Sequence, residues 1–416
     1  MVPKVGSEDN MSSYSVKRKA FYSQFPSFWA DLYGSEYSLF HVLTVPEQQA
    51  CLIREATERM GAVFFKTARL LRSLSDEQLL ELGYPKSSLG FIRAKHLFPE
   101  SVIARFDFAV TKDSIKLLEF NSDTPTFIVE CFHVNGKICR EFGLINPNEN
   151  AERLLSSGIT KAVIDASHGK HSPNIVFTAH DDYLEDWNTT IYLSDLCQVK
   201  NKVVPLSALQ ITDHAVLDSD GKPIDVLYRQ TYPLEHLLED RDPITGDLVG
   251  IELLQLVNKG KLSLINPVSA FLLQPKSIQC LIWGLAENGA FYTEEEQKWI
   301  KEYMLPTYLE ADVFTGKQSF VKKPSLGREG DTVTIWDDQS NITAQNAYQT
   351  YQEELPVYQA YTSLPTVSLE TEKGMEELSY VIGSFLIAGK ASSIGVRAGG
   401  KITGNESYFL PVGIKK

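Results

Sequence analysis

Residues 105–121 read RFDFAVTKDSIKLLEFN, a pattern that predicts a β-hairpin. Two runs of alternating side chains flank a turn-like Thr-Lys-Asp-Ser segment. Because side chains alternate across a strand, Arg105 and Asp107 share one face. A turn centred on the Asp of that segment places Asp107 opposite Glu119 and Arg105 opposite Asn121. The sequence therefore predicts a hairpin with two facing carboxylates on one polar face.

Facing carboxylates on neighbouring strands repel each other, so such a pair is reasonable where a cation lies between them. The side chains of Asp107, Glu119 and Asn121 carry hard oxygen donors, which Mg²⁺ prefers. The other interpretation is a solvated polar face on which Arg105 balances the two acids. The spacing alone leaves both interpretations open.

A second segment, residues 320–333, reads FVKKPSLGREGDTV. It predicts a strand that ends in lysine, a short loop with two glycines, and another strand. Glycines let the backbone approach a ligand closely, and successive N–H groups can surround a phosphate. Lys323 could add a point charge there. The segment fits neither the P-loop nor the Rossmann pattern in its context, and an ordinary hairpin with a glycine bulge is the alternative.

Composition limits the classes of function. The chain has 416 residues and a formal net charge of −13, with a pI near 5.2. This charge argues against a nucleic-acid-binding surface, although a few local cations suffice for one nucleotide. The five widely spaced cysteines contain no C-x-x-C pair, which argues against a zinc site or a disulfide framework. With no signal-peptide pattern and no stretch near the ~18 apolar residues of a membrane span, we expect a cytoplasmic protein.

The first hundred residues have a mainly helical pattern after a polar tail at 1–13. Aromatic residues crowd together between 15 and 45, and we expect them to pack in a core. Apolar residues at helical spacing predict a helix from 46 to about 71. Ser75 and Gln78 form a capping-box pattern that predicts a short second helix.

The rest of the chain divides into two patterns. Residues 126–165 are helical in pattern, and strands and helices then alternate up to about residue 228, which predicts an open α/β layer. After that layer, helices are expected at about 233–258, 267–287 and 293–309, the last with a capping box. Strands are expected at about 318–323, 331–336, 356–361, 379–389 and 392–399. This last group predicts a largely antiparallel sheet.

Together these segments resemble the glutathionylspermidine synthase family of the ATP-grasp carboxylate–amine ligases, from about residue 21 to 414. The most specific match is Arg105-x-Asp107 with Glu119-x-Asn121 and the Asp-Thr-Pro-Thr turn at 123–126, followed by the glycine loop at 322–330. The resemblance implies an α+β or α/β protein with an ATP-grasp fold in permuted order. It implies a helical N-terminal part (1–98), a metal-binding hairpin packed on the ATP-grasp domain (99–125), a pre-ATP-grasp α/β substrate domain (126–260) and an ATP-grasp nucleotide-binding domain (261–416).

The resemblance also implies roles for single residues. The metal ligands would be Asp107, Glu119 and Asn121, and Arg105 would be catalytic, facing the transferring phosphoryl and acyl groups. The ATP-binding residues would be Lys276, Lys323, Gly327, Gly330, Gln359 and Arg397. The substrate-binding residues would be Thr124, Thr126, Asp182, Glu185, Asp186 and Thr231. Taken alone, Lys276 could equally be a snorkelling lysine, Gln359 part of an edge strand and Arg397 a surface arginine.

The activity implied is ATP-dependent amide-bond formation through an acyl phosphate, with ATP and one or two Mg²⁺ ions as cofactors. The partners would be a small-molecule or peptide carboxylate and an amine, such as a polyamine or an amino acid, with no nucleic acid and no membrane; a homodimer is left open. Only about 100 residues precede the hairpin, so no cysteine amidase domain is expected. The alternatives are a degenerate ATP-grasp protein that binds nucleotide without ligase activity, and a phosphotransferase.

Overall fold

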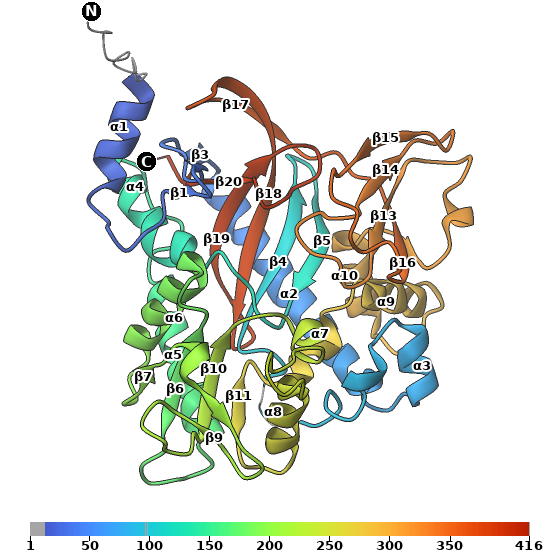
Figure 1. Cartoon of the computed structure of the whole chain (residues 1–416). Helices are drawn as coiled ribbons and strands as arrows, with labels where there is room; N and C mark the ends of the chain where they lie inside the picture. The colour runs from blue at the N-terminus through green and yellow to red at the C-terminus, as the bar shows by residue number, and fades with distance from the viewer. Residues whose placement is uncertain (1–12, 96, 98, 416) are drawn as a thin grey trace, which may run out of the picture.

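The computed structural model describes residues 13–95, 97 and 99–415. The described part is built around three larger sheets, which Figure 1 shows side by side. A six-stranded antiparallel sheet lies in the centre. A five-stranded antiparallel sheet lies on one side of it and a four-stranded parallel sheet lies below. The chain is therefore a mixed α+β protein, and the site described below is formed where the two antiparallel sheets meet.

The central sheet joins strands from the two halves of the chain. Its order is β20-β19-β18-β4-β5, and β17 pairs with the far end of β18. The strands span β4 (Ile103–Val110), β5 (Ile115–Asn121), β17 (Thr366–Thr371), β18 (Gly374–Ile387), β19 (Lys390–Gly399) and β20 (Tyr408–Leu410). Every residue of β4 is buried, and the long helix α2 (Glu47–Leu71) packs against β18 and β19. Strand β4 of the predicted hairpin is thus an interior strand of this sheet, and β5 is its edge strand.

The register of the hairpin is the predicted one. Asp107 pairs with Glu119, and Arg105 pairs with Asn121. A β-bulge follows Asp107 and shifts the register for the rest of the hairpin. The bulge increases the local twist, and it leaves the polar face unchanged from Arg105 to Asp107. The prediction of two facing carboxylates is confirmed.

The five-stranded sheet has the order β12-β16-β13-β14-β15. Its strands span β12 (Thr307–Tyr308), β13 (Phe320–Pro324), β14 (Thr334–Trp336), β15 (Ile342–Gln345) and β16 (Pro356–Ala360). Helix α9 (Ser277–Glu287) packs on β12 and β16, and α10 (Glu294–Tyr303) lies between α2 and β5. The predicted capping box of α10 is present, since Thr293 and Glu296 satisfy each other's backbone N–H groups. The glycine loop connects β13 to β14 and faces the central sheet.

The parallel sheet has the order β11-β10-β6-β7, which agrees with the predicted α/β layer. Its strands span β6 (Ile175–Ala179), β7 (Lys202–Val203), β10 (Val226–Gln230) and β11 (Ser263–Ile265). Helices α5 (Ala151–Ala166) and α6 (Leu184–Leu196) pack against it. The carboxyl ends of β6 and β10 lead into the segments 180–186 and 231–235, a usual place for ligand-binding residues in such sheets.

Four predicted helical stretches are interrupted. The stretch 126–165 contains the π-helical turn η2 (Glu130–Val134), α4 (Asn135–Glu141) and α5. The stretch 233–258 contains only α7 (Leu234–Leu237) and α8 (Val249–Asn258), and 267–287 is a 3-10 helix, η4 (Val268–Leu273), followed by α9. The stretch 293–309 ends at Tyr303, before Pro306, and continues as β12. Proline removes a backbone donor and clashes with the preceding turn, which explains the breaks at Pro275 and Pro306.

The N-terminal part contains more than helices. It has α1 (Ser13–Tyr22), the hairpin β1 (Asp31–Leu32) and β2 (Ser35–Glu36), α2, and α3 (Asp76–Glu81) with the predicted Ser75–Gln78 capping box. Strand β3 (Leu43–Thr44) pairs in parallel with β21 (Val412–Gly413). Phe21, Tyr22, Phe28 and Trp29 are buried in one core cluster, as predicted. The predicted polar tail lies outside the described residues except for Ser13, which begins α1.

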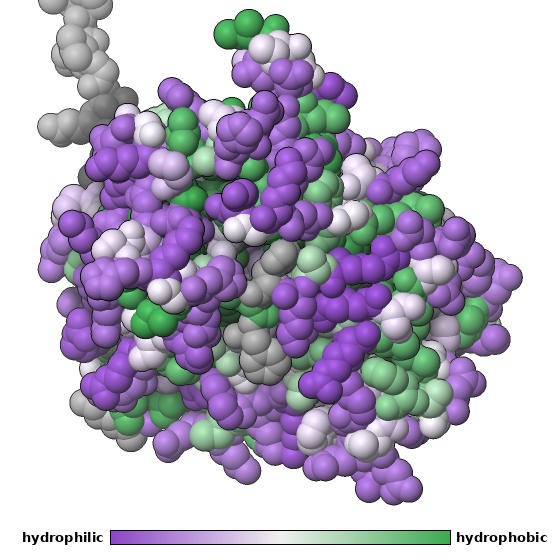
Figure 2. All heavy atoms as spheres, turned by 90° about the horizontal axis from the view of Figure 1, so that it is seen from below, coloured by the Kyte–Doolittle hydropathy of each residue, from purple (hydrophilic) through white to green (hydrophobic). Residues whose placement is uncertain are grey.

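The remaining short elements are η1 (Lys86–Ser88), η3 (Leu206–Ala208), η5 (Ala311–Val313), β8 (Gln210–Ile211) and β9 (Val216–Leu217). All five cysteines are free thiols, and three of them are buried. No helix within the described part of the chain is long and apolar enough to cross a bilayer. Seen from below in Figure 2, the surface is mostly hydrophilic, with hydrophobic residues in small separate groups.

Candidate active site

On the polar face of the β4–β5 hairpin, Arg105 and Asp107 are buried and tightly bonded, and Glu119 and Asn121 are partly buried. Arg105 Nε donates to Asp107 Oδ1 at 2.7 Å, and Nη2 donates to Oδ2 at 2.9 Å. Asn121 Nδ2 lies 3.4 Å from Asp107 Oδ2 and 3.5 Å from Glu119 Oε1. The amide of Asn121 therefore stands at the point where the two carboxylates meet. Three oxygen-bearing side chains converge on one place, as the register requires.

The charges on this face are balanced unevenly. Burial raises the pKa of Asp107, and Arg105 opposes that shift. Burial also acts to raise the pKa of Glu119, but Lys276, Lys323 and Arg105 outweigh it and lower that pKa. The Arg105 guanidinium stays charged, because Asp107 raises its pKa against the effect of burial. The site thus contains two ionisable acids in contact with each other and three cations beside them. Such an arrangement can accept a further charged group.

Two lysines approach Glu119 from the side of the glycine loop. Lys276 Nζ lies 3.3 Å from Glu119 Oε2 and donates to the backbone oxygen of Gly327 at 2.6 Å. Lys323 Nζ donates to Gln359 Oε1 at 2.7 Å and to Leu118 O at 3.3 Å. Burial lowers the pKa of Lys323 to about 8. Neither lysine snorkels to bulk solvent, so that interpretation of Lys276 is excluded.

One cavity contains most of the residues that the sequence assigned to ATP and metal. It is lined by Asp107, Glu119, Lys276, Lys323, Gly327, Gly330, Gln359 and Arg397. Arg397 is partly buried on β19, and its Nη2 donates to Gly404 O at 3.1 Å. The structure thus brings together two carboxylates and three cations that lie far apart in the sequence. The lining also includes residues that the sequence pattern did not single out, namely Glu329, Asp331, Tyr361, Thr362, Lys401 and Thr403.

The glycine loop is held against two neighbouring segments. Gly330 has φ +70°, and a Cβ there would lie 2.6 Å from the backbone oxygen of Thr403, so only glycine fits. Arg328 Nε donates to Glu235 Oε1 at 3.0 Å, and Glu329 accepts a hydrogen bond from Asn405. These contacts fix the loop over the cavity from both sides.

Gln359 has a different environment from the one expected of an adenine contact. Its side chain is buried, and its amide nitrogen donates to Gln279 Oε1 at 3.1 Å and to Thr307 Oγ1 at 3.3 Å. Its oxygen accepts from Lys323. Both the oxygen and the nitrogen of this amide are therefore hydrogen-bonded within the protein, and the amide orients Lys323. Gln359 and Ala360 at the end of the strand line the cavity together with Tyr361, Thr362 and Leu364, which follow it.

We predict that Gln359→Leu weakens ATP binding about 10-fold or more, because a hydrogen bond to a charged group contributes about 1.5–3 kcal/mol. Isothermal titration of the full chain with Mg-ATP measures the effect. Gln345→Leu, on the exposed strand β15, is the matched control and should bind normally. Unchanged affinity in Gln359→Leu would show that Lys323 does not need this partner.

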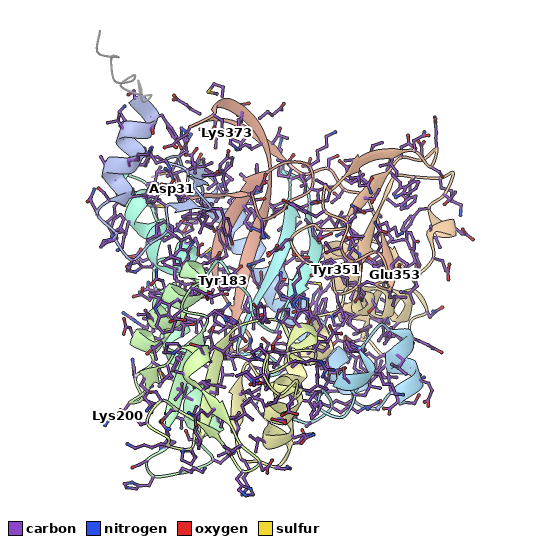
Figure 3. The ribbon with its side chains drawn as sticks, viewed as in Figure 1. Asp31, Tyr183, Lys200, Tyr351, Glu353 and Lys373 are labelled. Atoms are coloured by element: carbon purple, nitrogen blue, oxygen red, sulfur yellow. The ribbon has the colours of Figure 1, made fainter. Side chains whose placement is uncertain are left out.

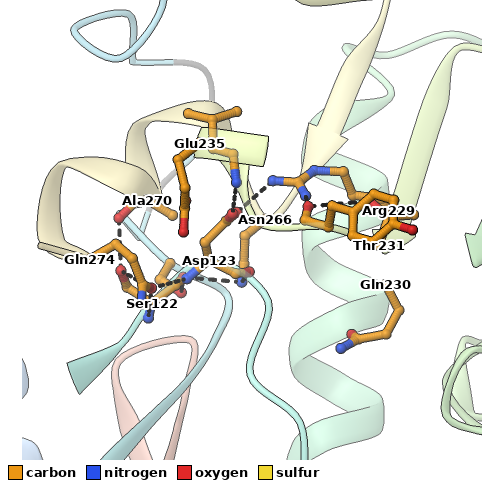
Figure 4. Close-up of polar contacts among 12 residues, drawn as sticks. Ser122, Asp123, Arg229, Gln230, Thr231, Glu235, Asn266, Ala270 and Gln274 are labelled. Atoms are coloured by element: carbon orange, nitrogen blue, oxygen red, sulfur yellow. Dashed lines mark hydrogen bonds and ion pairs between the residues drawn. The ribbon is translucent and has the colours of Figure 1, made fainter. Parts of the chain in front are cut away.

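A buried network fixes the turn that follows the hairpin (Figure 4). Arg229 Nη2 donates to Asp123 Oδ1 at 2.6 Å, and the backbone N–H of Leu234 donates to Asp123 Oδ2 at 3.1 Å. On the other side, Gln274 Oε1 accepts from the backbone N–H of Ser122 at 2.9 Å, and Asn266 Nδ2 donates to the backbone oxygen of Asp123 at 2.6 Å. The turn is therefore tied to both β10 and η4.

This turn carries the two threonines assigned to the acyl substrate. Thr124 is partly buried and Thr126 is exposed. The backbone oxygen of Thr126 accepts from Arg105 Nη1 at 2.8 Å. The turn thus lies directly against Arg105, the arginine that the sequence predicts to be catalytic.

The other assigned substrate residues lie at the carboxyl ends of β6 and β10. Glu185 and Asp186 are in the first turn of α6 and are partly buried. Burial raises the pKa of Glu185 to about 8 and that of Asp186 to about 6, the latter against a hydrogen bond from Gln230. Thr231 directly follows β10 and is partly buried, whereas Asp182 is exposed. Next to them, Tyr183 lies on the α6 side of the central sheet, across from Tyr351 on the side of the five-stranded sheet (Figure 3).

The donor set of the hairpin fits a magnesium ion in its chemistry. Asp107 and Glu119 supply carboxylate oxygens, and a half-turn of the Asn121 amide presents its oxygen to the same point. Within residues 13–95, 97 and 99–415 no group of three or more His, Cys, Asp or Glu side chains could hold a metal ion. A magnesium site here therefore depends on Asn121 as its third donor.

The fold and this arrangement define a class of protein. A solved structure of a "glutathione synthetase like-effector" from Globodera pallida, in its apo form, superimposes with a TM-score of 0.61 over 96% of each chain, at 10% identity. The present chain thus has a glutathione synthetase-like fold. Residues 16–415 match the family model described as "Glutathionylspermidine synthase preATP-grasp", and the chain belongs to that family. A protein from Haemophilus influenzae named "Putative acid--amine ligase" is 23% identical over 319 residues, which cover 74% of this chain and 73% of that protein.

Several residues around the site carried no clear sequence signal. The sequence indicates Asp123 only as part of a turn, and its partner Arg229 comes from a strand about a hundred positions later. Glu130 Oε1 accepts a hydrogen bond at 2.7 Å from the hydroxyl of Tyr37, which lies in the N-terminal part of the chain. A lone Glu in an apolar run was the one available hint for Glu130, since burying a carboxylate is costly unless it has a function or a partner.

Proposed function

We propose that this protein is an ATP-dependent acid–amine ligase that forms an amide bond through an acyl phosphate. The observation that carries the proposal is the convergence of Asp107, Glu119, Lys276, Lys323 and Arg397 on one cavity beneath a glycine loop. Such a constellation suits a triphosphate better than any smaller ligand. We further propose that the two antiparallel sheets form an ATP-grasp nucleotide site in permuted chain order, and that the parallel sheet serves the substrates.

In this proposal the chain's own cations position the nucleotide. Lys276 and Lys323 neutralise its phosphates, and the glycine loop closes over them. Asp107, Glu119 and Asn121 would hold Mg²⁺, which supplies neutralisation of charge on the phosphate oxygens. The substrate carboxylate attacks the γ-phosphorus, and ADP leaves. This step is needed because a carboxylate cannot expel oxide when an amine attacks.

Arg105 acts at the transfer itself. Its guanidinium is held rigidly by Asp107 and by the backbone of Thr126, so it is oriented before the substrate arrives. It stabilises negative charge on the phosphoryl group and then on the tetrahedral intermediate. The amine attacks the acyl carbon, and phosphate leaves. Catalysis consists mainly of positioning and charge stabilisation.

The substrate side of the proposal uses the ends of β6 and β10. Thr124 and Thr126 would contact the acid, next to Arg105. Glu185 and Asp186 would bind a cationic amine, with Thr231 and the exposed Asp182 nearer the rim. Carboxylates at this end favour an amine such as a polyamine or an amino acid.

The test is a screen of carboxylate and amine pairs for ATP-dependent phosphate release, with mass spectrometry of the products. Peptide carboxylates including glutathione, and amines including spermidine, belong in the panel. Hydroxylamine should be included as a general trap for acyl phosphates. We expect an amide or hydroxamate that forms only with ATP. No turnover with any pair, together with no binding of Mg-ATP, would refute the proposal.

The residues are also compatible with two other functions that the observations favour less, and the same screen distinguishes them. A degenerate protein would bind Mg-ATP and release no phosphate. A phosphotransferase would release ADP at a rate that does not depend on the amine. The completeness of the set, from Arg105 to Arg397, favours the ligase.

A further inference from the structure

A second cavity, which we call the rear cavity, lies on the opposite face of the five-stranded sheet from the candidate site. Lys323 of β13 and Ile335 of β14 line the cavity of the candidate site, whereas Lys322, Thr334 and Trp336 line the rear cavity. Successive side chains of a strand point to opposite faces, which accounts for this division. The rear cavity has a volume of about 280 Å³. This volume is near the lower end of the ~300–1,000 Å³ of ligand sites, so it suits a small molecule.

The rear cavity contains charges without partners. Lys322 and Glu354 both line it, and both are half-buried. Among the residues that the structure describes, neither the ammonium group of Lys322 nor the carboxylate of Glu354 makes a hydrogen bond or an ion pair. They do not neutralise each other, because Lys322 lies opposite Tyr358, four positions from Glu354. One free cation and one free anion therefore approach the cavity from different ends.

Trp336 adds an unpartnered donor on the wall of the rear cavity. Its indole Nε1 is buried and has no hydrogen-bond partner within the described part of the chain. Buried polar groups in native proteins usually have a partner, and each exception calls for an explanation. A polar molecule bound in the rear cavity would supply one.

The rear cavity is also connected to the glycine loop. Pro324 lines both cavities, Asp331 lines that of the candidate site, and Thr332 lines the rear cavity. The segment before β16 is bonded to the end of the loop, since the backbone N–H of Thr350 donates to Asp331 Oδ1 and that of Tyr351 donates to Thr332 Oγ1, both at 2.9 Å. An occupant of the rear cavity would therefore contact the segment that holds the loop in place.

The free groups define a class of ligand. A carboxylate would satisfy Lys322, and an ammonium group would satisfy Glu354 through charge-assisted hydrogen bonds. A simple anion or a simple cation would leave one of the two charges without a partner. An α-amino acid carries both groups on a small molecule, which agrees with the size of the rear cavity.

We propose that the rear cavity binds a free α-amino acid and that this occupant strengthens nucleotide binding at the candidate site. Its carboxylate contacts Lys322 and its ammonium group contacts Glu354, so it holds the segment before β16 against β13. That segment in turn holds the end of the glycine loop. A loop that is already held loses less freedom when a nucleotide binds, which improves affinity. The effect on the nucleotide rests on the proposed function, whereas the amino-acid site does not.

Tryptophan fluorescence of the full chain tests the binding, because Trp336 lines the rear cavity. The standard amino acids are titrated one at a time. We expect at least one of them to give a saturable change that is largely lost in Trp336→Phe. Acetate and methylamine, which carry one charge each, should bind at least about 10-fold more weakly than that amino acid.

Substitutions of the two free charges locate the site. Lys322→Met and Glu354→Gln should each weaken binding of the amino acid about 10-fold or more. Both variants should fold, since neither charge leaves a partner behind. Lys317→Met and Glu353→Gln, at exposed positions nearby in the sequence, are the matched controls and should bind normally.

Isothermal titration with Mg-ATP tests the effect on the nucleotide. With the amino acid present at saturation, Mg-ATP should bind about fivefold or more tightly than without it, in the usual range of coupling between two sites. At the same amino-acid concentration, Lys322→Met should show little or none of this difference, and Lys317→Met should show all of it.

Each other outcome overturns a defined part of the proposal. If no amino acid gives a saturable response, or if Lys322→Met and Glu354→Gln leave the response unchanged, the rear cavity is not an amino-acid site. If acetate binds equally well, the cavity is a simple anion site. If the amino acid binds there and the affinity for Mg-ATP does not change, the effect on the nucleotide is refuted. If Mg-ATP does not bind under any condition, the proposed nucleotide site fails and the coupling fails with it, while the fluorescence titration still decides the amino-acid site.

Discussion

Replacing Asp107 by Asn, or Glu119 by Gln, should abolish amide formation while the chain still folds. Each substitution keeps the size of the side chain and one acceptor oxygen, and removes one negative charge from the point where Asn121 meets both acids. If a magnesium ion is held there, the phosphate charge loses its counter-ion at the moment of transfer. We expect kcat to fall on the order of 10³-fold, as when a preorganised electrostatic group is removed.

Three measurements check this prediction. Circular dichroism and thermal unfolding should show an intact fold. Titration with Mg²⁺ at fixed ATP should show that the variants need more Mg²⁺ for activity and that high magnesium restores the activity only partly. Asp113→Asn at the exposed tip of the same hairpin is the control and should behave as the wild type. Full activity of both variants at limiting Mg²⁺ would show that the metal assignment is wrong.

The choice of Asn rather than Ala at position 107 follows from Arg105. Asp107 accepts two hydrogen bonds from a guanidinium that is 4% exposed. Ala would leave that buried cation without its partner and would destabilise the fold for a reason unrelated to catalysis. Asn keeps one acceptor oxygen, so a loss of rate with an intact fold can be assigned to the missing charge.

Arg229→Leu should destabilise the protein by about 3–5 kcal/mol, the cost of leaving one member of a buried ion pair alone. Asp123 and Arg229 are 2% and 4% exposed and lie 2.6 Å apart. Without the arginine, the Asp123 carboxylate keeps, among the residues that the structure describes, only the backbone N–H of Leu234 as a donor. Chemical denaturation followed by circular dichroism measures the free energy of unfolding.

A double substitution gives the internal test. Asp123→Asn combined with Arg229→Leu removes both charges, so part of the lost stability should return relative to Arg229→Leu alone. Lys161→Ala breaks an exposed pair with Asp165 on α5 and serves as the control. That change should stay within about 0.5 kcal/mol, because exposed ion pairs contribute little. If Arg229→Leu were equally mild, the buried pair would not stabilise this turn.

The local features of the fold could be predicted from the sequence. The register of the hairpin follows from its two-residue alternation, and the capping boxes at Ser75 and Thr293 follow from hydroxyl and amide or carboxylate groups three positions apart. The long predicted helices were wrong where a proline or a change of burial interrupts them, as at Pro275 and Pro306. Strands β15 and β17 were missed, because they are short or exposed and show little hydrophobic pattern.

Contacts between distant segments could not be predicted in the same way. The spacing of Asp107 and Glu119 indicates that they face each other, but nothing near them in the sequence points to Lys276 or to Glu130. The role of Gln359 is the clearest example. Its strand suggested an adenine contact, whereas the packing of β16 beside β13 turns its amide to Lys323. Which partner such a side chain contacts depends on how the strands of the whole sheet pack together.

The position of β4 in the central sheet has a consequence for how the protein is made. The strand is interior only because β18 pairs with its outer edge. Synthesis starts at the N-terminus, so the ribosome releases this hairpin long before its partner strand exists. Until then the nascent chain carries an open edge, and for much of that time the two acids also lack Lys276 and Lys323, which are made between the hairpin and β18. We expect the candidate site to be the last part of the molecule to form, so that chains interrupted before β18 do not bind Mg-ATP.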